Sequence, residues 1–364
     1  MKRILLATLL GSFPVLSFAT GLNFWESSTV NSSLASANGA TGGDASVLAL
    51  APSSITQLGA PTITASLTFY EVSTDYNIFG ATTDYSQGDP IPAGFFTLPV
   101  SDDLTAGLAI YSRTAADISI PQISVVVPIT AETRVRPITV SIAPTLAYQW
   151  NNLSFGATVE LLQSHYELYQ KSCFIGCNEF KLDGSTSGWT GALSATWIVN
   201  SEFSVAFAHR FATKYSDSNI EFDLPEITSL YATWRALNNL NWHFTYSHTG
   251  WEDKGVRYTD YSDPFGLLVG TTDSHRVATS VNYRLNDWEL RAGISADKAI
   301  DAFGGTDFRY RLGFGYHFTE NLQADISGVF EDYAKKEFNT SDGLNLISVQ
   351  NSGFALSIGI TYRL

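Results

Sequence analysis

The chain has 364 residues and a formal net charge of −14 at pH 7, with 45% hydrophobic, 13% aromatic and only 15% charged residues. The 21 lysines and arginines form no run that could neutralise phosphates, which excludes a nucleic-acid-binding protein. Abundant aromatic rings and sparse charges instead favour a chain with extensive contact to a non-aqueous phase.

The amino terminus has the three parts of a secretory signal peptide. Met1-Lys2-Arg3 is basic, and residues 4–18 are mostly apolar. Ser17 and Ala19 then supply the small residues of a cleavage site before Thr20. We therefore expect a signal peptide over residues 1–19. No later stretch reaches the ~18 consecutive apolar residues of a membrane-spanning helix, so a membrane location would require a β-barrel.

Residues 20–60 show no alternation and are rich in serine, alanine and glycine. Small side chains let a backbone pack into a confined space. The composition predicts a plug, or hatch, folded inside the lumen of a barrel. The alternative is a flexible periplasmic tail.

Alternation of apolar and polar residues, which marks a strand with one buried face, begins at Thr62. A weaker strand is expected over residues 91–98, a third from Leu104, and a long outer loop over residues 115–133. That loop contains an apolar run, which predicts a groove for an apolar ligand, although the run could equally pack under a neighbouring loop. The groove residues are Ile118, Ile120, Ile123, Val125, Val126 and Val127.

Two strands, residues 135–149 and the stretch from Leu153, meet at the turn Asn151-Asn152. The two cysteines of the chain, Cys173 and Cys177, follow. Secretion to an oxidising compartment favours a small structural disulfide between them. Two thiolates without a nearby histidine make a poor zinc site, so no metal is predicted.

Short turns alternate with long loops through the rest of the chain, and the hairpin over residues 306–334 is its clearest element. Phe308, Tyr310 and Leu312 share one face of it, whereas Arg309 and Arg311 share the other. About 14 strands with this rhythm are typical of bacterial outer-membrane barrels. We therefore predict an all-β transmembrane antiparallel barrel over residues 61–364, with its apolar face toward lipid.

An outer-membrane hydrolase is one alternative. Gly184-Ser185-Thr186-Ser187-Gly188 has threonine at the nucleophile position and precedes a strand, so it is not a nucleophile elbow. The six histidines are scattered, although a Ser/His/acid set assembled across strands stays open. We predict no enzyme and no cofactor. A general diffusion porin is the other alternative, but it would need an open polar channel rather than a filled lumen.

Several short motifs stand out along the mature chain: Ala51-Pro52-Ser53 at the end of the small-residue segment that contains Asp44, Leu224-Pro225-Glu226, Thr249 with Trp251, and Asp273 with Arg276. Together with the order of strands and loops, they resemble the FadL/TodX family of outer-membrane transporters for long-chain fatty acids and other hydrophobic compounds. The resemblance covers nearly the whole mature chain. Asp44 and Pro52 would then lie in a segment like the family's hatch, whose signature is Asn-Pro-Ala where this chain has Ala51-Pro52-Ser53.

The resemblance implies passive uptake across the outer membrane of a Gram-negative bacterium. A hydrophobic ligand would enter an apolar groove among the outer loops, reach a lumen pocket, and leave sideways through a kinked strand after the hatch shifts. The implied partners are outer-membrane lipid, lipopolysaccharide and the barrel assembly machinery, and a monomer is expected.

The sequence departs from the family where members that take fatty acids place basic residues near the carboxylate. Gln170 and Thr272 occupy those positions, with Lys171 adjacent to the first. Because burying an unpaired carboxylate is costly, a neutral or weakly polar hydrophobic ligand is expected as readily as a fatty acid. Arg210 and Arg276 fall on the predicted lumen face, where they could guide a polar head or form cross-strand salt bridges.

Overall fold

The computed structural model describes residues 23–78, 81–115, 118–126, 129–173, 176–216, 220–252, 255–258, 272–300, 304–339 and 345–364. The expected signal peptide, residues 1–19, and the groove residue Val127 lie outside these ranges. Among the helices of the described residues, none is both long and apolar enough to cross a membrane.

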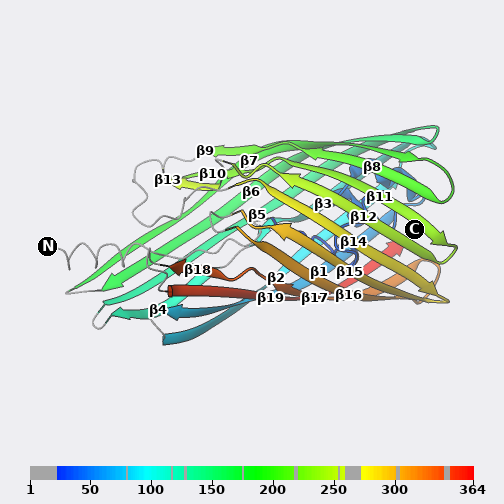
Figure 1. The fold of residues 1–364 in the computed structure, drawn as a ribbon. Helices are drawn as coiled ribbons and strands as arrows, with labels where there is room; N and C mark the ends of the chain where they lie inside the picture. Colours follow the sequence, from blue (N-terminus) through cyan, green and yellow to red (C-terminus); the bar gives the residue numbers. More distant parts are fainter. Residues whose placement is uncertain are drawn as a thin grey trace.

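Fourteen strands of the described chain follow one another around a closed antiparallel β-barrel (Figure 1). The first and last strands pair from Thr62↔Arg363 to Ile78↔Ile347, which closes the sheet. This confirms the predicted fold class. In order, the strands are β1 (Thr62–Ile78), β2 (Ala81–Pro99), β3 (Leu104–Ala115), β5 (Ile129–Trp150), β6 (Leu153–Cys173), β7 (Cys177–Ile198), β8 (Phe203–Arg210), β11 (Ile227–Leu237), β12 (Leu240–Thr249), β14 (Ser274–Leu285), β15 (Trp288–Lys298), β16 (Thr306–His317), β17 (Leu322–Asp332) and β19 (Asn345–Arg363).

The remaining described strands belong to the long connections. β4 (Ile118–Val126) pairs with β5, and β18 (Lys336–Asn339) pairs with β19. A separate small sheet joins β9 (Thr213–Ser216), β10 (Ile220–Leu224) and β13 (Gly255–Tyr258).

Two predictions were wrong. The stretch 115–133 contains β4, which pairs with β5, and the weaker strand expected over residues 91–98 begins ten residues earlier, at Ala81. β5 and β7 have 22 residues each, whereas β16 has 12. About ten residues cross a bilayer at a tilt, so the surplus extends past the membrane. There both faces of a strand meet water, and the apolar alternation that reveals a strand is lost.

The barrel wall carries apolar residues outside and polar residues inside. Along β16, exposed and buried residues alternate strictly from Thr306 to Gly315, with Phe308, Tyr310 and Leu312 exposed and Arg309 and Arg311 buried. This inversion of a soluble core is what a lipid-facing barrel requires, because lumen-facing residues meet water or protein instead.

One end of the barrel is made of tight turns. Asn151 and Asn286 adopt positive φ angles of 54° and 55° there, which asparagine tolerates better than most residues. Aromatic rings gather on the outer face at this end: Trp288 lies 4.7 Å from Tyr316 between ring centroids, and Tyr316 lies 4.9 Å from Phe318. Such rings mark a membrane interface, so the long strands project from the opposite, long-loop end.

The N-terminal segment, which we define as residues 23–60, contains the short helices α2 (Thr29–Ser33), η1 (Ala45–Ala49) and η2 (Pro52–Gln57). Ser28 caps α2 by accepting a hydrogen bond from the Asn31 amide, and Asp44 caps η1 in the same way from Ser46. Almost every residue from Ser28 to Ile55 is buried. The segment packs against the inward faces of strands around the barrel.

Candidate functional site

The N-terminal segment is joined to the barrel wall by hydroxyl groups on opposite sides of the lumen. Thr29 Oγ1 lies 2.7 Å from Ser357 Oγ on β19. The Ser53 amide donates to Ser194 Oγ on β7 at 2.7 Å. Glycines on the wall make room for these contacts, because a Cβ at Gly156 would collide with Ser53 and its neighbour. Small residues on both partners therefore allow the close approach.

A buried charge network on β3, β6 and β8 lies beside the segment. Glu160, fully buried, forms ion pairs with Arg113 and with Arg210 Nε, the latter at 2.7 Å. Arg210 also donates to the Tyr111 hydroxyl at 2.8 Å and to the carbonyl of Ala49 in the segment at 3.1 Å. Both arginine charges are thus shared with one carboxylate.

A second network, on β14 to β17, contacts the amino-terminal end of the segment. Arg276 faces Asp297 with an Nε–Oδ1 distance of 3.3 Å, and its guanidinium carbon lies 4.6 Å from the centroid of the Trp25 ring. Arg311 forms a 2.8 Å ion pair with Glu26. Burial alone would raise the pKa of the Glu26 carboxyl, but the positive charges of Arg311 and Arg309 outweigh it and lower that pKa. Glu26 is therefore ionised where it contacts Arg311.

A third network lies toward the tight-turn end, where Arg291 contacts Glu289 and forms a 2.6 Å ion pair with Asp325. Within the described residues, each buried arginine has a carboxylate oxygen within 3.3 Å. These arginines are Arg113, Arg276, Arg291, Arg309 and Arg311. The lumen is polar and its buried arginines are paired, although Arg113 and Arg210 share the single carboxylate of Glu160.

An apolar cluster lies on the long-loop side of Glu160, and we call it the aromatic cluster: Leu162, Tyr166, Tyr215, Leu224, Trp251 and Ile300. Leu162 and Tyr166 follow Glu160 on the same inward face of β6, while Tyr215 and Leu224 come from the small sheet. On β7, a Cβ at Gly184 would overlap Tyr166 and one at Gly188 would lie 2.9 Å from Tyr215. Glycines thus leave room for the rings.

The barrel wall is incompletely paired between β2 and β3. Their ladder stops at Gly94↔Ile110, although β1 pairs with β2 as far as Ala81 and β3 continues along β5 to Ala115. The β3–β5 register shifts between Ser112 and Thr114, which is a β-bulge at Arg113. The N-terminal segment occupies part of the edge, because the Phe24 amide donates to the Arg113 carbonyl at 3.0 Å.

The structure brings some of the predicted residues together and separates others. Arg210 and Arg276 face the lumen, and each is held by a carboxylate. Thr272 is exposed, and its amide donates to the Ile300 carbonyl at 2.7 Å beside the aromatic cluster. Gln170 and Lys171 lie toward the tip of the β6–β7 hairpin. In the backbone register, Lys171 lies opposite Glu132 on β5 and Glu179 on β7.

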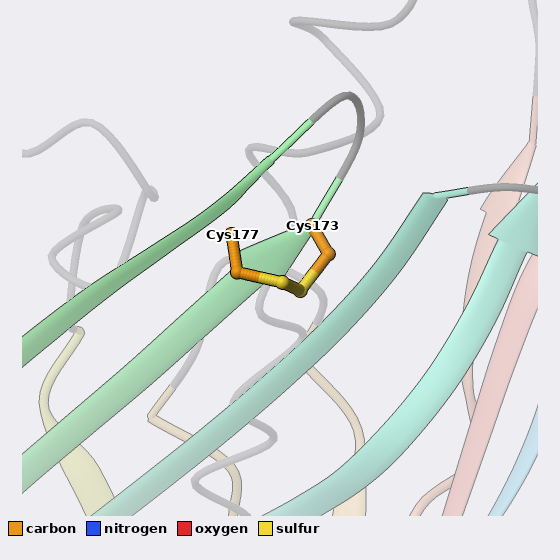
Figure 2. The surroundings of a disulfide bond; sticks show 2 residues. All are labelled: Cys173 and Cys177. Atoms are coloured by element: carbon orange, nitrogen blue, oxygen red, sulfur yellow. A yellow bond between two sulfur atoms is a disulfide. The ribbon is translucent and has the colours of Figure 1, made fainter.

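Other predicted positions make contacts that stabilise the fold: a helix cap, a helix start and a disulfide. Asp44 caps η1, and burial raises the pKa of its carboxyl although the Ser46 bonds oppose the shift. Pro52 begins η2. Cys173 and Cys177 form a disulfide at the tip of the β6–β7 hairpin (Figure 2). For the groove residues Ile118 to Val126 the structure describes the backbone of β4, and their side chains, like that of Gln170, lie outside the description.

Sequence reasoning missed most of the aromatic cluster. Tyr215 and Ile300 come from connections whose sequence has no alternation, and Trp251 was noted only for its position in a motif. Trp25 and Glu26 were missed because their arginine partners are distant in sequence. The glycines Gly184 and Gly188 were a usable signal, since glycine inside a strand marks close approach by another group.

Comparisons with known proteins agree with this architecture. Residues 13–179 match the model of the outer membrane protein transport protein family, OMPP1/FadL/TodX. A crystal structure of a Pseudomonas aeruginosa FadL homologue superposes with a TM-score of 0.76 at 14% identity, covering 94% of this chain and 99% of the other. The P. putida toluene transporter TodX gives a TM-score of 0.69 at 14% identity, covering 98% and 99%.

The Ralstonia pickettii toluene transporter TbuX is also similar, with a TM-score of 0.66, 14% identity, and 94% and 99% coverage. At these identities the solved structures establish the fold. The comparison with curated proteins gives no significant match.

Proposed function

We propose that the chain, whose residues 13–179 match the outer membrane protein transport (OMPP1/FadL/TodX) family model, acts in the outer membrane of a Gram-negative bacterium and takes up neutral hydrophobic molecules by passive diffusion. The ligand enters at the long-loop end and binds in the aromatic cluster. It leaves sideways between β2 and β3 after the amino-terminal end of the N-terminal segment moves. The barrel acts as a monomer without catalysis and is inserted by the barrel assembly machinery.

The aromatic cluster is the observation that carries the proposal. Its six members are buried apolar or aromatic side chains, and Trp251 is only 1% exposed. An apolar molecule gains about 25 cal/mol for each Å² of surface removed from water, so a ligand that parts these packed side chains would be held among them without any energy source. The rings of Tyr166, Tyr215 and Trp251 also favour flat aromatic ligands through ring–ring contacts.

The state of the lumen arginines favours a neutral ligand over a fatty acid. A buried carboxylate needs a cation that is not already neutralised. Arg113 and Arg210 both bind Glu160, on the same inward face of β6 as Leu162 and Tyr166, so the network has a net charge of +1 spread over two guanidinium groups. A fatty-acid carboxylate would have to approach them beside the like charge of Glu160, whereas a hydrocarbon or other uncharged compound needs no such partner.

The end of the β2–β3 ladder at Gly94↔Ile110 supports a sideways exit. A ligand that passes from the lumen directly into hydrocarbon never returns to water, so the free energy gained on capture is not lost again. The residues that now cover the β3 edge belong to the N-terminal segment, which supports a coupling between movement of its amino-terminal end and opening of the wall.

The proposal is tested with purified protein in liposomes, by comparing uptake of a neutral hydrocarbon with uptake of a fatty acid of equal chain length. We expect saturable uptake of the hydrocarbon. The fatty acid should compete with that uptake at least about tenfold more weakly than an unlabelled hydrocarbon does, since a binding penalty of about 1.4 kcal/mol corresponds to a factor of ten. Equal uptake of both would contradict the neutral-ligand proposal.

Two further measurements separate the alternatives. Liposome swelling in sugars would reveal a diffusion porin, and we expect none. Hydrolysis of soluble esters would reveal an outer-membrane hydrolase, and we expect none above that of empty liposomes.

A further inference from the structure

A row of basic and hydroxyl side chains crosses five neighbouring strands at one height. Thr228 on β11 pairs with His209 on β8 and with His248 on β12, and His248 pairs with His275 on β14. Since Arg276 pairs with Asp297, the next residues on those two strands, His275 and Lys298, continue the row onto β15. We call His209, His248, His275 and Lys298 the rim row.

The rim row faces outward. The residues next to it in sequence, Arg210, Arg276 and Asp297, point into the lumen networks, and side chains alternate along a strand. His275 and Lys298 are exposed, and His209 and His248 are half-buried. None of these four residues belongs to the ligand path proposed above.

The rim row also marks where the outer wall stops being apolar. One outward position nearer the tight-turn end, β8, β12 and β14 carry Phe207, Tyr246 and Val277, with exposed fractions of 43%, 42% and 59%. The Tyr246 hydroxyl lies 2.8 Å from His275 Nδ1, and the His209 ring packs edge-on against Phe211 at 4.7 Å. Because tight turns form the other end, this boundary lies in the outer leaflet of the membrane.

The same boundary has the opposite charge elsewhere on the barrel. On β17 the outward residue after Phe330 is Asp332, and on β1 the one after Phe69 is Glu71, both exposed. The concentration of basic residues on β8 to β15 is therefore local. Two acids lie beside it: Asp273, which accepts a hydrogen bond from His248 Nε2 at 3.2 Å, and Glu226, the exposed residue two positions before Thr228.

We propose that the rim row binds the phosphate groups of outer-leaflet lipid, whose acyl chains lie on the apolar wall below. Lysine is a common phosphate ligand, and histidine has a ring N–H to donate in either charge state. A spacing of about 4.8 Å between strands puts the four side chains within about 20 Å, which suits the headgroup of a phosphorylated glycolipid. The proposal rests on the outer-membrane location and not on the transported ligand.

The test is native mass spectrometry of the purified barrel with bis-phosphorylated lipid A and with the same lipid after enzymatic removal of its phosphates. The double variant His275→Gln with Lys298→Gln keeps polar side chains at both positions. We expect it to lose at least about tenfold in affinity for the phosphorylated lipid, corresponding to about 1.4 kcal/mol, with no change for the dephosphorylated lipid.

The control variant is Asp332→Asn with Glu71→Gln, which removes two charges from the acidic part of the same boundary and should not weaken binding. Both variants must keep the folded band on unboiled gels and the hydrocarbon uptake of the parent protein. Excess inorganic phosphate should not compete, since lipid is the proposed occupant. An unchanged affinity in the rim variant, or an equal loss for both lipids, would overturn the proposal.

Discussion

The two halves of the N-terminal segment, residues 23–44 and 45–60, are held in the barrel by a different balance of forces. Near Trp25 and Glu26 the contacts are a cation–π pair and an ion pair with lumen arginines, beside the hydroxyl contact between Thr29 and Ser357. From Ala45 onward one arginine, Arg210, donates to the Ala49 carbonyl, but most contacts are hydroxyl hydrogen bonds and an apolar core in which Val47, Leu48 and Ile55 pack against the wall. Dry packing is rigid, whereas charge contacts weaken when a charge is removed, so we expect the first half to move and the second to stay.

The largest effect is expected at the network that joins the wall to the second half. Glu160→Gln leaves Arg113 and Arg210 without their shared carboxylate in a buried site, which should cost about 3–5 kcal/mol of unfolding free energy. Urea titration followed by the gel-mobility shift of the folded barrel would measure it. Where the variant folds, its freed arginines should strengthen fatty-acid competition in the uptake assay, and unchanged competition would contradict the neutral-ligand argument.

Two glycines allow each half to be displaced separately. An added Cβ at Gly156 would meet Ser53 backbone in the second half, and one at Gly313 would meet Ser33 in the first. Gly156→Ala should destabilise the barrel by about 1–3 kcal/mol, as overpacking does. Gly313→Ala should cost less and instead raise ion conductance across planar bilayers, because the first half yields.

Gly328→Ala is the matched control for both variants. Gly328 pairs with Leu312 beside Gly313, yet an added Cβ there meets nothing within 4 Å. It should change neither stability nor conductance. Equal behaviour of the Gly156 and Gly313 variants would show that the two halves do not differ.

A pH titration separates the halves by charge. The pKa of Glu26 in the folded protein lies below its ordinary value of 4.5, so its contribution to anchoring is present above that pH and is lost as pH falls through the folded-state pKa. Hydrogen exchange of residues 24–36 should therefore accelerate at low pH relative to residues 45–57. In Glu26→Gln this relative change should be absent, and its persistence would assign the effect to another group.

The smallest effect is expected at Asp44. Asp44→Asn retains a side-chain oxygen for the Ser46 amide and removes a buried charge whose pKa is raised by burial, so stability should stay within about 0.5 kcal/mol or rise slightly. Asp44→Ala removes the cap and should cost about 1 kcal/mol. Thermal unfolding of the two variants measures the difference, and equal losses would place the contribution in the charge rather than the cap.

The sequence predicted the barrel because its wall is built from local alternation. Phe308, Tyr310 and Leu312 reveal their face without any knowledge of their neighbours. The strands beyond the membrane, such as the outer part of β1 and β2, were missed because both of their faces are polar. Local pattern thus predicts a strand only where one face meets an apolar phase.

The candidate site was less predictable because its members meet only after the sheet closes. Arg276 was identified as a lumen residue, but its contacts with Trp25 and Ala35 depend on a segment about 250 positions away, for which no local periodicity exists. The aromatic cluster has the same origin, since Tyr215 and Ile300 reach it from separate connections. Contacts of this kind are set by tertiary packing alone.

The central claim, that the first half of the N-terminal segment must move for uptake, is tested most directly by tethering it. An added Cβ at Gly293 would lie 3.1 Å from the Ala35 Cβ, so Ala35→Cys with Gly293→Cys places two thiols for a disulfide. We predict that hydrocarbon uptake by this variant stops when the tether is oxidised and returns on reduction, while the parent protein and each single variant are unaffected by the same reductant. Equal uptake with the tether closed and open would contradict the account.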